Sequence, residues 1–108
     1  MSPVSFVRGQ VYFASLPGVE GEKPYLIVSN NARNAALGTA LAARITTSSK
    51  AHIRTAVPIP AGECCVGFVL CDDIEPLYPE DVRRLVGGLS LPVMVDVGTA
   101  LKVALALT

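Results

Sequence analysis

Hydrophobic positions fall in short runs separated by turn-forming residues along most of the chain. The runs at residues 10–16 (QVYFASL) and 24–29 (PYLIVS) carry β-branched and aromatic side chains and are bounded by turn residues, which is typical of strands. Between them, residues 17–22 (PGVEGE) combine two glycines, a proline and two acids, which predicts a loop. The Asn30-Asn31 pair that follows the second run is predicted to be a turn.

The middle of the chain alternates in the same way. Residues 39–46 (TALAARIT) form a third strand candidate, although their alanines leave a helix open. Residues 47–55 (TSSKAHIRT) are polar and basic, which predicts a loop that leads into a strand ending near Pro58. The plan so far is therefore a series of short strands joined by loops.

The next segments continue this plan. Residues 67–71 (GFVLC) are predicted to be a buried strand, and residues 72–77 (DDIEPL) either continue it or begin another, limited by Pro76. Residues 79–84 (PEDVRR) are predicted to make one helical turn that begins with a proline. Residues 85–89 then form a short strand or a connection.

The last element is predicted to be a helix. Ser90 suits an N-cap, and Pro92 is tolerated in a first turn. Apolar side chains recur every four residues and form one stripe, flanked by two further apolar residues: Val93, Val97, Leu101 and Leu105, with Met94 and Ala104 beside them. Asp96 and Lys102 fall on other faces. Five to seven short strands followed by one helix indicate a mainly β fold, a small barrel with a packed C-terminal helix.

Composition adds one ambiguity. The 108 residues, 1–108, are expected to form a single domain. Hydrophobic residues make up 51% of the chain and the mean hydropathy is +0.49, which indicates either a core rich in Ala and Val or apolar surface covered by a partner. Composition alone does not choose between the two.

Membrane insertion and export are not expected. The most apolar stretch, residues 91–107, contains Asp96 and Lys102, whereas a spanning helix needs about 20 mostly uncharged residues. The N-terminal sequence MSPVSFVRG lacks the basic start and long apolar run of a signal peptide. The expected location is therefore cytoplasmic.

The cysteines indicate neither a disulfide framework nor a metal site. There are three of them, Cys64, Cys65 and Cys71, and an odd count in an unexported chain favours reduced thiols. Two are adjacent, and no CxxC pair or Cys/His set has zinc spacing. No bound metal or cofactor is therefore expected.

Charge is divided unevenly although the net charge is zero. Residues 1–54 hold six cations against two acids, a balance of +4, and residues 55–108 hold three cations against seven acids, a balance of −4. This asymmetry suggests an anionic partner for the first half of the chain.

Five blocks in order along the chain closely resemble the MazF/PemK family of toxins of type II toxin–antitoxin systems. They are residues 8–16 (RGQVYFASL), 23–34 (KPYLIVSNNARN), 42–49 (AARITTSS), 67–77 (GFVLCDDIEPL) and 97–107 (VGTALKVALAL). The resemblance implies an SH3-like barrel of the CcdB/MazF/PemK type with a C-terminal helix, acting as a homodimer. It also implies cleavage of single-stranded RNA without a metal, and neutralisation by a cognate antitoxin.

The resemblance also implies two catalytic positions. One is the family's arginine before the proline that opens the second strand; here that position is Lys23, a departure from the family's pattern. The other is a threonine after the isoleucine of the third strand, which matches Thr46. Arg8 and Gly9 match the family's opening pair and place Arg8 among the expected RNA-binding residues.

These residue types suit RNA cleavage because RNA carries its own nucleophile, the 2′-OH. The reaction needs that hydroxyl deprotonated, the phosphorane charge stabilised and the 5′-oxygen protonated. A lysine is a poor base near its usual pKa, so Lys23 is assigned phosphate stabilisation first, with proton donation to the leaving oxygen as a further role. It lacks the bidentate fork of an arginine, and on sequence alone an isolated lysine is usually solvated surface.

Hydroxyl groups cluster at the end of the third strand. Thr46 is expected to bond a phosphate oxygen or orient the 2′-OH, although threonine is also common in strands for its β-propensity. Thr47, Ser48 and Ser49 follow it and offer further donors for RNA, or are ordinary loop residues.

A basic group follows these hydroxyls. Lys50, His52 and Arg54 alternate, and on an extended backbone side chains two apart point the same way, so the three are expected to track an RNA backbone together. A lone loop histidine such as His52 is nevertheless more often inert. By the same alternation Arg44 is expected to point with Thr46.

Two rival functions share the fold. A CcdB-like gyrase poison would resemble its relatives in a tryptophan-bearing C-terminal tail, but this chain has no Trp and ends ALALT. An inactive binding module on the same barrel is the second rival, suggested by Lys23 at the usual arginine position. Retention of Thr46 and of the basic loop argues against it.

Overall fold

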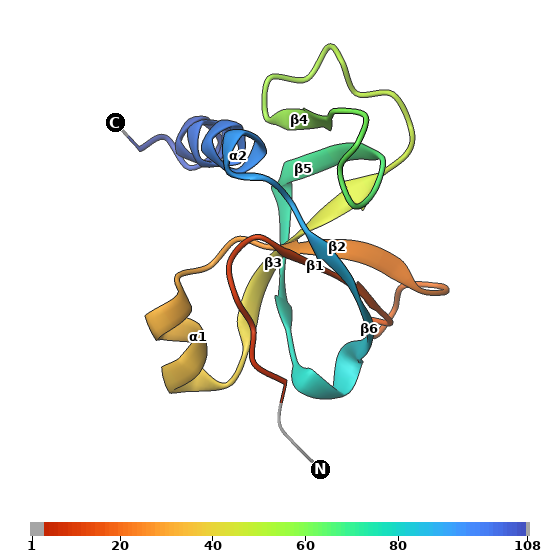
Figure 1. Ribbon diagram of the computed structural model, residues 1–108, viewed down its shortest axis with the longest axis vertical. Helices are drawn as coiled ribbons and strands as arrows, with labels where there is room; N and C mark the ends of the chain where they lie inside the picture. The colour runs from red at the N-terminus through yellow and green to blue at the C-terminus, as the bar shows by residue number, and fades with distance from the viewer. Residues whose placement is uncertain (1–3, 108) are drawn as a thin grey trace.

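The computed structural model describes residues 4–107 and consists of one curved, six-stranded antiparallel sheet with a helix at either end (Figure 1). The elements in chain order are β1 (Gln10–Ala14), β2 (Lys23–Ile27), α1 (Asn31–Leu37), β3 (Ala40–Thr46), β4 (Ala56–Ile59), β5 (Gly67–Leu77), a 3₁₀ turn (Pro79–Asp81), β6 (Val82–Gly88) and α2 (Leu91–Ala104). The strand order in the sheet is β4-β5-β3-β2-β1-β6. The predicted plan of short strands followed by a C-terminal helix is confirmed.

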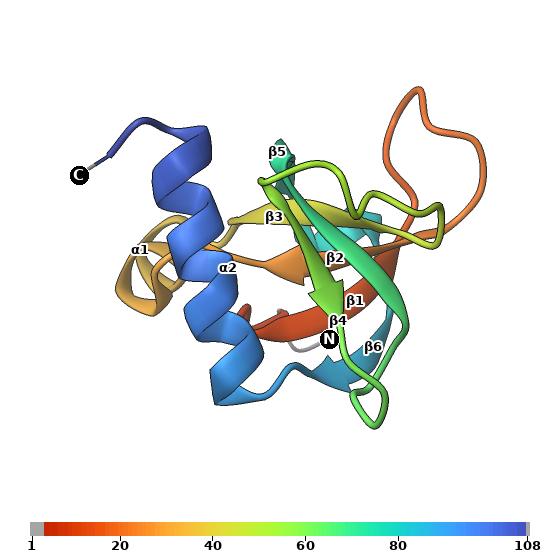
Figure 2. The same ribbon diagram turned by 90° about the horizontal axis from the view of Figure 1, so that it is seen from above.

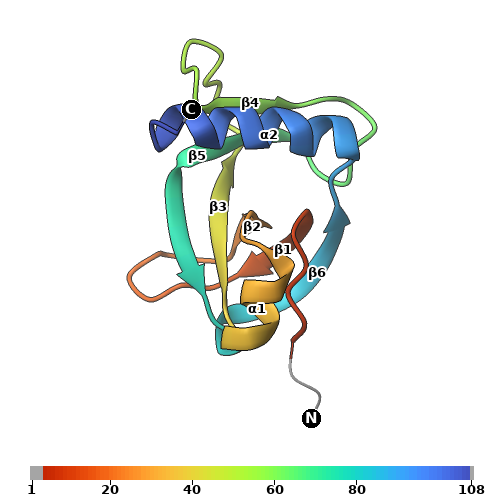
Figure 3. The same ribbon diagram turned by 90° about the vertical axis from the view of Figure 1, so that its left-hand side faces the viewer.

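The two faces of the sheet build two separate apolar clusters. The α2 cluster lies between one face and α2 and contains Val11, Leu26, Ala43, Ile45, Val57, Ile59, Val69, Cys71, Leu89, Val93, Met94, Val97 and Ala100. The inner cluster lies on the other face and contains Phe6, Tyr12, Ala14, Leu16, Tyr25, Ile27, Ala40, Ala42 and Leu77. Figure 3 shows α2 lying across β4 and β5 at the end of the molecule opposite α1. Figure 2 shows the β1–β2 loop projecting on the side away from α2.

The alanines of β3 fit a strand because both of its faces are buried. Ala40 and Ala42 belong to the inner cluster, whereas Ala43 and Ile45 belong to the α2 cluster. Successive side chains of a strand point to opposite faces, so small residues fill both sides where the curved sheet leaves little space. The strand alternative is therefore confirmed over the helix.

β5 resolves the second ambiguity, since residues 72–77 continue the strand that begins at Gly67. Its first half pairs with β4 as far as Leu70, and all of it runs beside β3. Pro76 lies beyond the last residue paired with β4, so its missing N–H disturbs no bond on that side.

α1 was not predicted, and the predicted turn at Asn30-Asn31 is wrong because a helix begins there. The side chain of Asn30 accepts bonds from the backbone N–H groups of Ala32 and Arg33, and Gly38 ends the helix with a φ of 72°. The helix presents no apolar stripe. Its buried residue is Asn34, which accepts a bond from the Ser29 hydroxyl at 2.5 Å.

The segment before α2 also differs from the prediction. The helical turn expected over residues 79–84 is only the 3₁₀ turn, and β6 begins at Val82, earlier than the strand predicted from residue 85. Ser90 occupies the N-cap of α2, but its hydroxyl donates to the Glu63 carboxylate at 2.7 Å instead of capping the helix.

The predicted apolar stripe of α2 is confirmed for most of its length. Val93, Val97 and the neighbouring Met94 are buried and Leu101 is half-buried, whereas Leu105 follows the last helical residue and is exposed. In the described part of the chain, no helix is long and apolar enough to cross a membrane.

Candidate functional site

Lys23 and Thr46 lie at the ends of two neighbouring strands. Lys23 is the first residue of β2 and Thr46 is the last residue of β3, and Tyr25 pairs with Arg44 in the antiparallel register of these strands. The paired residues of the two strands end at Tyr25 and Arg44, so Lys23 and Thr46 each lie two residues beyond the last pair, at the same end of β2 and β3. Because side chains alternate along a strand, all four residues lie on the face of the inner cluster. The cation and the hydroxyl group therefore lie on one face, at the same end of two neighbouring strands.

The Lys23 side chain is half-buried beside β1, where its partner across the sheet is Ala14. Among residues 4–107, no side chain forms an ion pair or a hydrogen bond with Lys23. Its ammonium group therefore has three N–H donors to offer an anion.

The Thr46 hydroxyl is held by the loop that follows it. Its oxygen accepts a bond from the backbone N–H of Ser48 at 3.2 Å. Accepting this bond leaves the hydroxyl proton free to be donated to a phosphate oxygen.

Gly67 packs against the backbone of Thr46, and sequence reasoning did not single it out. Its φ is +119°, and a Cβ at this position would lie 2.2 Å from the Thr46 carbonyl oxygen. Only glycine fits both the dihedral angle and the contact. The signal in the sequence is a glycine at the first position of an otherwise bulky, buried strand, which marks a close approach of another backbone.

Arg44 extends the site along β3. Its Nε is buried, and within the described chain it has no hydrogen-bond partner. Burial raises the pKa of the adjacent Tyr25 hydroxyl, Arg44 lowers it, and Asp73 and Glu75 of β5 raise it. Arg44, Asp73 and Glu75 are therefore all close enough to Tyr25 to affect the pKa of its hydroxyl, and that Arg44 points with Thr46 stays a prediction.

The basic loop is not the extended segment that its alternating charges predicted. Backbone bonds from Ile53 to Lys50 and from Ala56 to Ile53 fold it into two turns, so the expectation of one shared direction is wrong. His52 is exposed, and Arg54 instead lines a shallow cavity against α2 together with Asp96. Lys50 is half-buried and comes four residues after Thr46.

The remaining predicted RNA-binding residues divide between the two ends of the sheet. Thr47 and Ser48 directly follow Thr46 and are exposed, so they remain candidates for contact with RNA at this site. Arg8 lies by the other end of β2, where its Nε donates to the Val28 carbonyl at 3.1 Å. The structure therefore does not bring Arg8 together with Lys23. Residues 4–107 contain no group of three or more His, Cys, Asp or Glu side chains placed to share a metal ion.

Solved structures define the fold class as that of a small toxin barrel. An endoribonuclease from a mycobacterial species, solved in complex with its cognate antitoxin, superimposes with a TM-score of 0.88 at 38% identity, covering 94% of this chain and 96% of that one. The MazE–MazF structure from Deinococcus radiodurans superimposes with a TM-score of 0.82 at 24% identity, covering 97% and 99% of the two chains, and shows the fold alone.

The sequence comparison is more specific. Residues 7–105 match the PemK-like, MazF-like toxins of type II toxin–antitoxin systems, and the chain belongs to this family. Endoribonuclease MazF1 of Mycobacterium bovis and endoribonuclease MazF4 of Mycobacterium tuberculosis are each 39% identical over 101 residues, which are 94% of this chain and 93% of the relative. The predicted family and its barrel fold are confirmed, and an endoribonuclease toxin is favoured over a gyrase poison and an inactive module.

Proposed function

We propose that this toxin cleaves single-stranded RNA without a metal, by attack of a 2′-OH group on the adjacent phosphorus, with Lys23 and Thr46 at the scissile phosphate. The observation that carries the proposal is the position of these two residues on one face, at the same end of the neighbouring strands β2 and β3. The endoribonucleases to which the chain is similar support the reaction class.

The side chains at this site suit the charges that develop in the reaction. The Lys23 ammonium stabilises the phosphorane oxygens, which gain negative charge, and can donate a proton to the leaving 5′-oxygen. The Thr46 hydroxyl donates to a phosphate oxygen and so fixes the phosphorus in line with the 2′-OH. These two residues therefore supply the charge stabilisation and the proton for the leaving oxygen. The 2′-OH proton is removed by solvent or by a neighbouring side chain.

The direct test is incubation of purified protein with mixed single-stranded RNA, duplex RNA and DNA in excess EDTA. Single-stranded RNA is expected to be cut and the other two nucleic acids to survive. Full inhibition by EDTA, with activity restored by a divalent metal, would overturn the metal-independent mechanism.

The toxin acts in the cytoplasm as a homodimer in this proposal. α2 carries large apolar side chains on its outer surface, Leu91, Val95 and Val103, which are exposed in the single chain. A closed twofold interface is the usual way for a small protein to cover such a surface. Light scattering at micromolar concentration should give twice the mass of the chain, and a stable monomer would contradict the dimer.

In this proposal a cognate antitoxin also binds and neutralises the toxin; the similar mycobacterial endoribonuclease was solved in complex with its own cognate antitoxin. An acidic antitoxin segment is the expected occupant of the RNA site, because cations that bind phosphates also bind carboxylates. Binding of the antitoxin and of RNA should therefore be mutually exclusive.

Lys50 and Arg54 are expected to bind the RNA backbone rather than to act on the scissile phosphate. Lys50→Ala and Arg54→Ala should weaken RNA binding, and each lost phosphate contact should reduce the slope of log affinity against log salt by about 0.7. Fluorescence anisotropy over a salt series measures this slope. Lys102→Ala on α2 removes the same charge away from β2 and β3, and with light scattering to show that its oligomeric state matches the wild type, it should leave the slope unchanged. An unaltered slope in both loop variants would show that these cations face away from the RNA.

Gly67 is expected to act through Thr46. Gly67→Ala should displace the end of β3 and lower cleavage about 10-fold, since misplacing a catalytic group by a fraction of an ångström already costs much of its effect. The matched control is Gly62→Ala, where φ is +94° and a Cβ would meet nothing within 4 Å. Both variants incur the backbone strain, so equal losses of activity would show that the contact with Thr46 is unimportant.

A further inference from the structure

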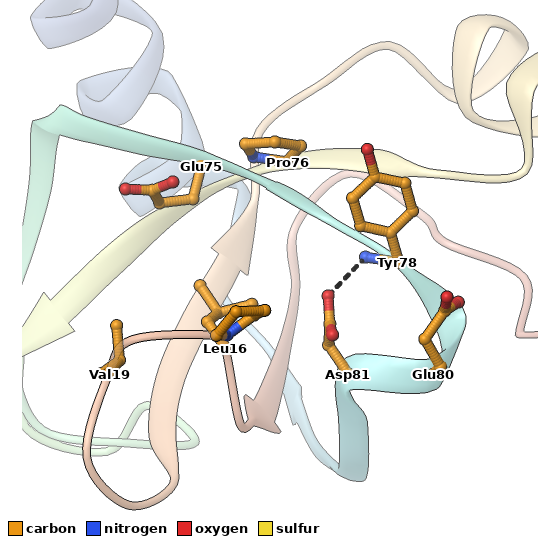
Figure 4. A pocket seen from close by; sticks show the side chains of 8 residues that line it. Leu16, Val19, Glu75, Pro76, Tyr78, Glu80 and Asp81 are labelled. Carbon is orange, nitrogen blue, oxygen red and sulfur yellow. Dashed lines mark hydrogen bonds between the residues drawn. The ribbon is translucent and has the colours of Figure 1, made fainter.

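A cavity of about 530 Å³ lies between the β1–β2 loop and the second half of β5 with the 3₁₀ turn that follows it (Figure 4). Leu16, Val19 and Pro76 give it apolar walls, and Glu75, Tyr78, Glu80 and Asp81 form its polar rim. Figure 4 places Glu75 on one side of the cavity, Tyr78 and Glu80 on the other, and Leu16 between them. The volume falls within the range of small-molecule sites, about 300–1,000 Å³.

The chemistry of the rim selects the kind of group that the cavity holds. Carboxylates are acceptors only, so they repel phosphate and favour a group that presents hydrogen-bond donors. The Tyr78 ring is 47% exposed and offers a face on which a planar group can stack. Apolar walls, an aromatic face and acceptors at the rim together suit a nucleobase better than a sugar or a phosphate.

The three carboxylates are not equivalent. Asp81 is already engaged, since its Oδ2 accepts a bond from the backbone N–H of Tyr78 at 3.1 Å. Glu75 and Glu80 are exposed, and within the described chain neither carboxylate accepts a hydrogen bond. Glu75 is nearer to the candidate site, because it pairs across the sheet with Ala42, two residues before Arg44.

The cavity adjoins the face that carries Lys23 and Thr46. Leu16 and Val19 belong to the loop that ends at Lys23. Glu75 lies close enough to Tyr25 to raise the pKa of its hydroxyl, and Arg44 lowers the same pKa. RNA whose scissile phosphate lies between Lys23 and Thr46 can therefore turn a neighbouring base into the cavity. In this arrangement Lys23 and Thr46 bind the backbone phosphate, and the anionic cavity binds a base edge.

Building on the proposed RNA cleavage, we propose that this cavity binds a guanine base of the substrate and that the Glu75 carboxylate reads its Watson–Crick edge. Guanine presents two adjacent donors there, N1–H and N2–H, which match the two oxygens of one carboxylate. Adenine and cytosine each place an acceptor beside their amino group, and uracil places its single N–H between two carbonyl oxygens. Guanine is thus the base that gains two bonds to Glu75 without a repulsive contact.

The test uses uridine-rich, single-stranded RNA heptamers that carry one guanine at each position in turn, cut in the presence of EDTA. Guanine at one position beside the cleaved bond should raise kcat/KM about 10-fold over uridine, which is within the usual discrimination of a bidentate base contact. Inosine at that position lacks the N2 amino group and should lose most of the gain. In Glu75→Gln the preference for guanine over inosine should fall to within about 2-fold.

Glu22→Gln is the matched control, since it removes the same charge from the β1–β2 loop outside the cavity walls. It should change the rates for all heptamers by a common factor and leave the guanine preference intact. A preference that both variants lose equally would reflect general charge and would overturn the assignment of Glu75.

Binding of uncleavable heptamers, with 2′-O-methyl groups throughout, separates this inference from the proposed function. If the protein cuts RNA but neither cutting nor binding favours guanine, the guanine site is wrong and the nuclease proposal stands. If nothing is cut but guanine is bound in a Glu75-dependent way, the cleavage mechanism fails and the base site stands. An arginine-containing peptide that binds in a Glu75-dependent way, with no guanine preference in the RNAs, would assign the cavity to the antitoxin and overturn the proposal.

Discussion

Lys23→Ala is expected to lower the rate of RNA cleavage about 100-fold or more while the protein stays folded. The lysine side chain is half-buried at the first position of β2, so its removal takes away a cation at the proposed scissile phosphate without opening the core. Loss of a group that stabilises charge mainly in the transition state reduces the chemical step more than it reduces binding. Single-turnover cleavage of a short RNA measures that step, with circular dichroism as the check on folding.

Two further variants show whether the loss of activity in Lys23→Ala comes from the loss of a charge at this position. Lys23→Arg should keep much of the activity, because the charge survives and the guanidinium fork binds phosphate oxygens in pairs. Lys102→Ala removes a lysine from α2, away from β2 and β3, and should cleave at the wild-type rate once light scattering shows that its oligomeric state is unchanged. A folded Lys23→Ala protein with near wild-type activity would show that this lysine is solvated surface.

Thr46→Val is expected to cripple cleavage to a comparable degree, because it replaces the hydroxyl with a methyl group of nearly the same shape. Thr46→Ser keeps a hydroxyl and should retain part of the activity. The same oxygen accepts the Ser48 backbone N–H, so the Tm of each variant must be measured alongside the rate. A fall in Tm with no fall in single-turnover rate would make Thr46 a structural residue.

If folded variants at both positions cleave RNA at near wild-type rates, the active site must lie elsewhere. Arg44 and His52 would then be tested next. Arg44 lies on the same face as Thr46, and its Nε has no hydrogen-bond partner among residues 4–107, whereas His52 is exposed in the following loop.

The strands and α2 could be predicted because each is marked by a local sequence pattern. A short apolar run between turn residues specifies a buried strand, and the four-residue spacing from Val93 specifies the buried face of α2. α1 gave no such signal, because its contact with the core is the polar side chain of Asn34 rather than an apolar stripe. Without an apolar pattern, the N-cap residue Asn30 was predicted to belong to a turn with Asn31, and the terminal Gly38 was not recognised as the end of a helix.

The site was only partly predictable, since it depends on strand register. The family resemblance identified Lys23 and Thr46, but their position at the same end of neighbouring strands follows from the pairing of β2 with β3, which no local pattern encodes. The contact of Gly67 with Thr46 joins β5 to the end of β3 and is equally non-local. The prediction for the basic loop was wrong for a different reason. Its alternating charges indicated an extended segment, whereas the backbone turns twice.

The cavity proposed to bind guanine could not be predicted from the sequence. Its walls come from the β1–β2 loop, the end of β5 and the 3₁₀ turn, and the acids among them appeared only as part of a negative second half. In the proposed site, Lys23 binds the phosphate and the acidic cavity binds the base.

The chemistry of the new RNA ends tests the central claim most directly. Cleavage by the substrate's own 2′-OH leaves a 2′,3′-cyclic phosphate or a 3′-phosphate on one fragment and a free 5′-OH on the other. Mass spectrometry of the fragments from an RNA cut in EDTA distinguishes these ends, and a single 2′-deoxy substitution at the cleaved nucleotide should abolish the cut. We expect cyclic phosphate or 3′-phosphate ends together with 5′-OH ends; 5′-phosphate ends, or cleavage at a 2′-deoxy position, would contradict the mechanism.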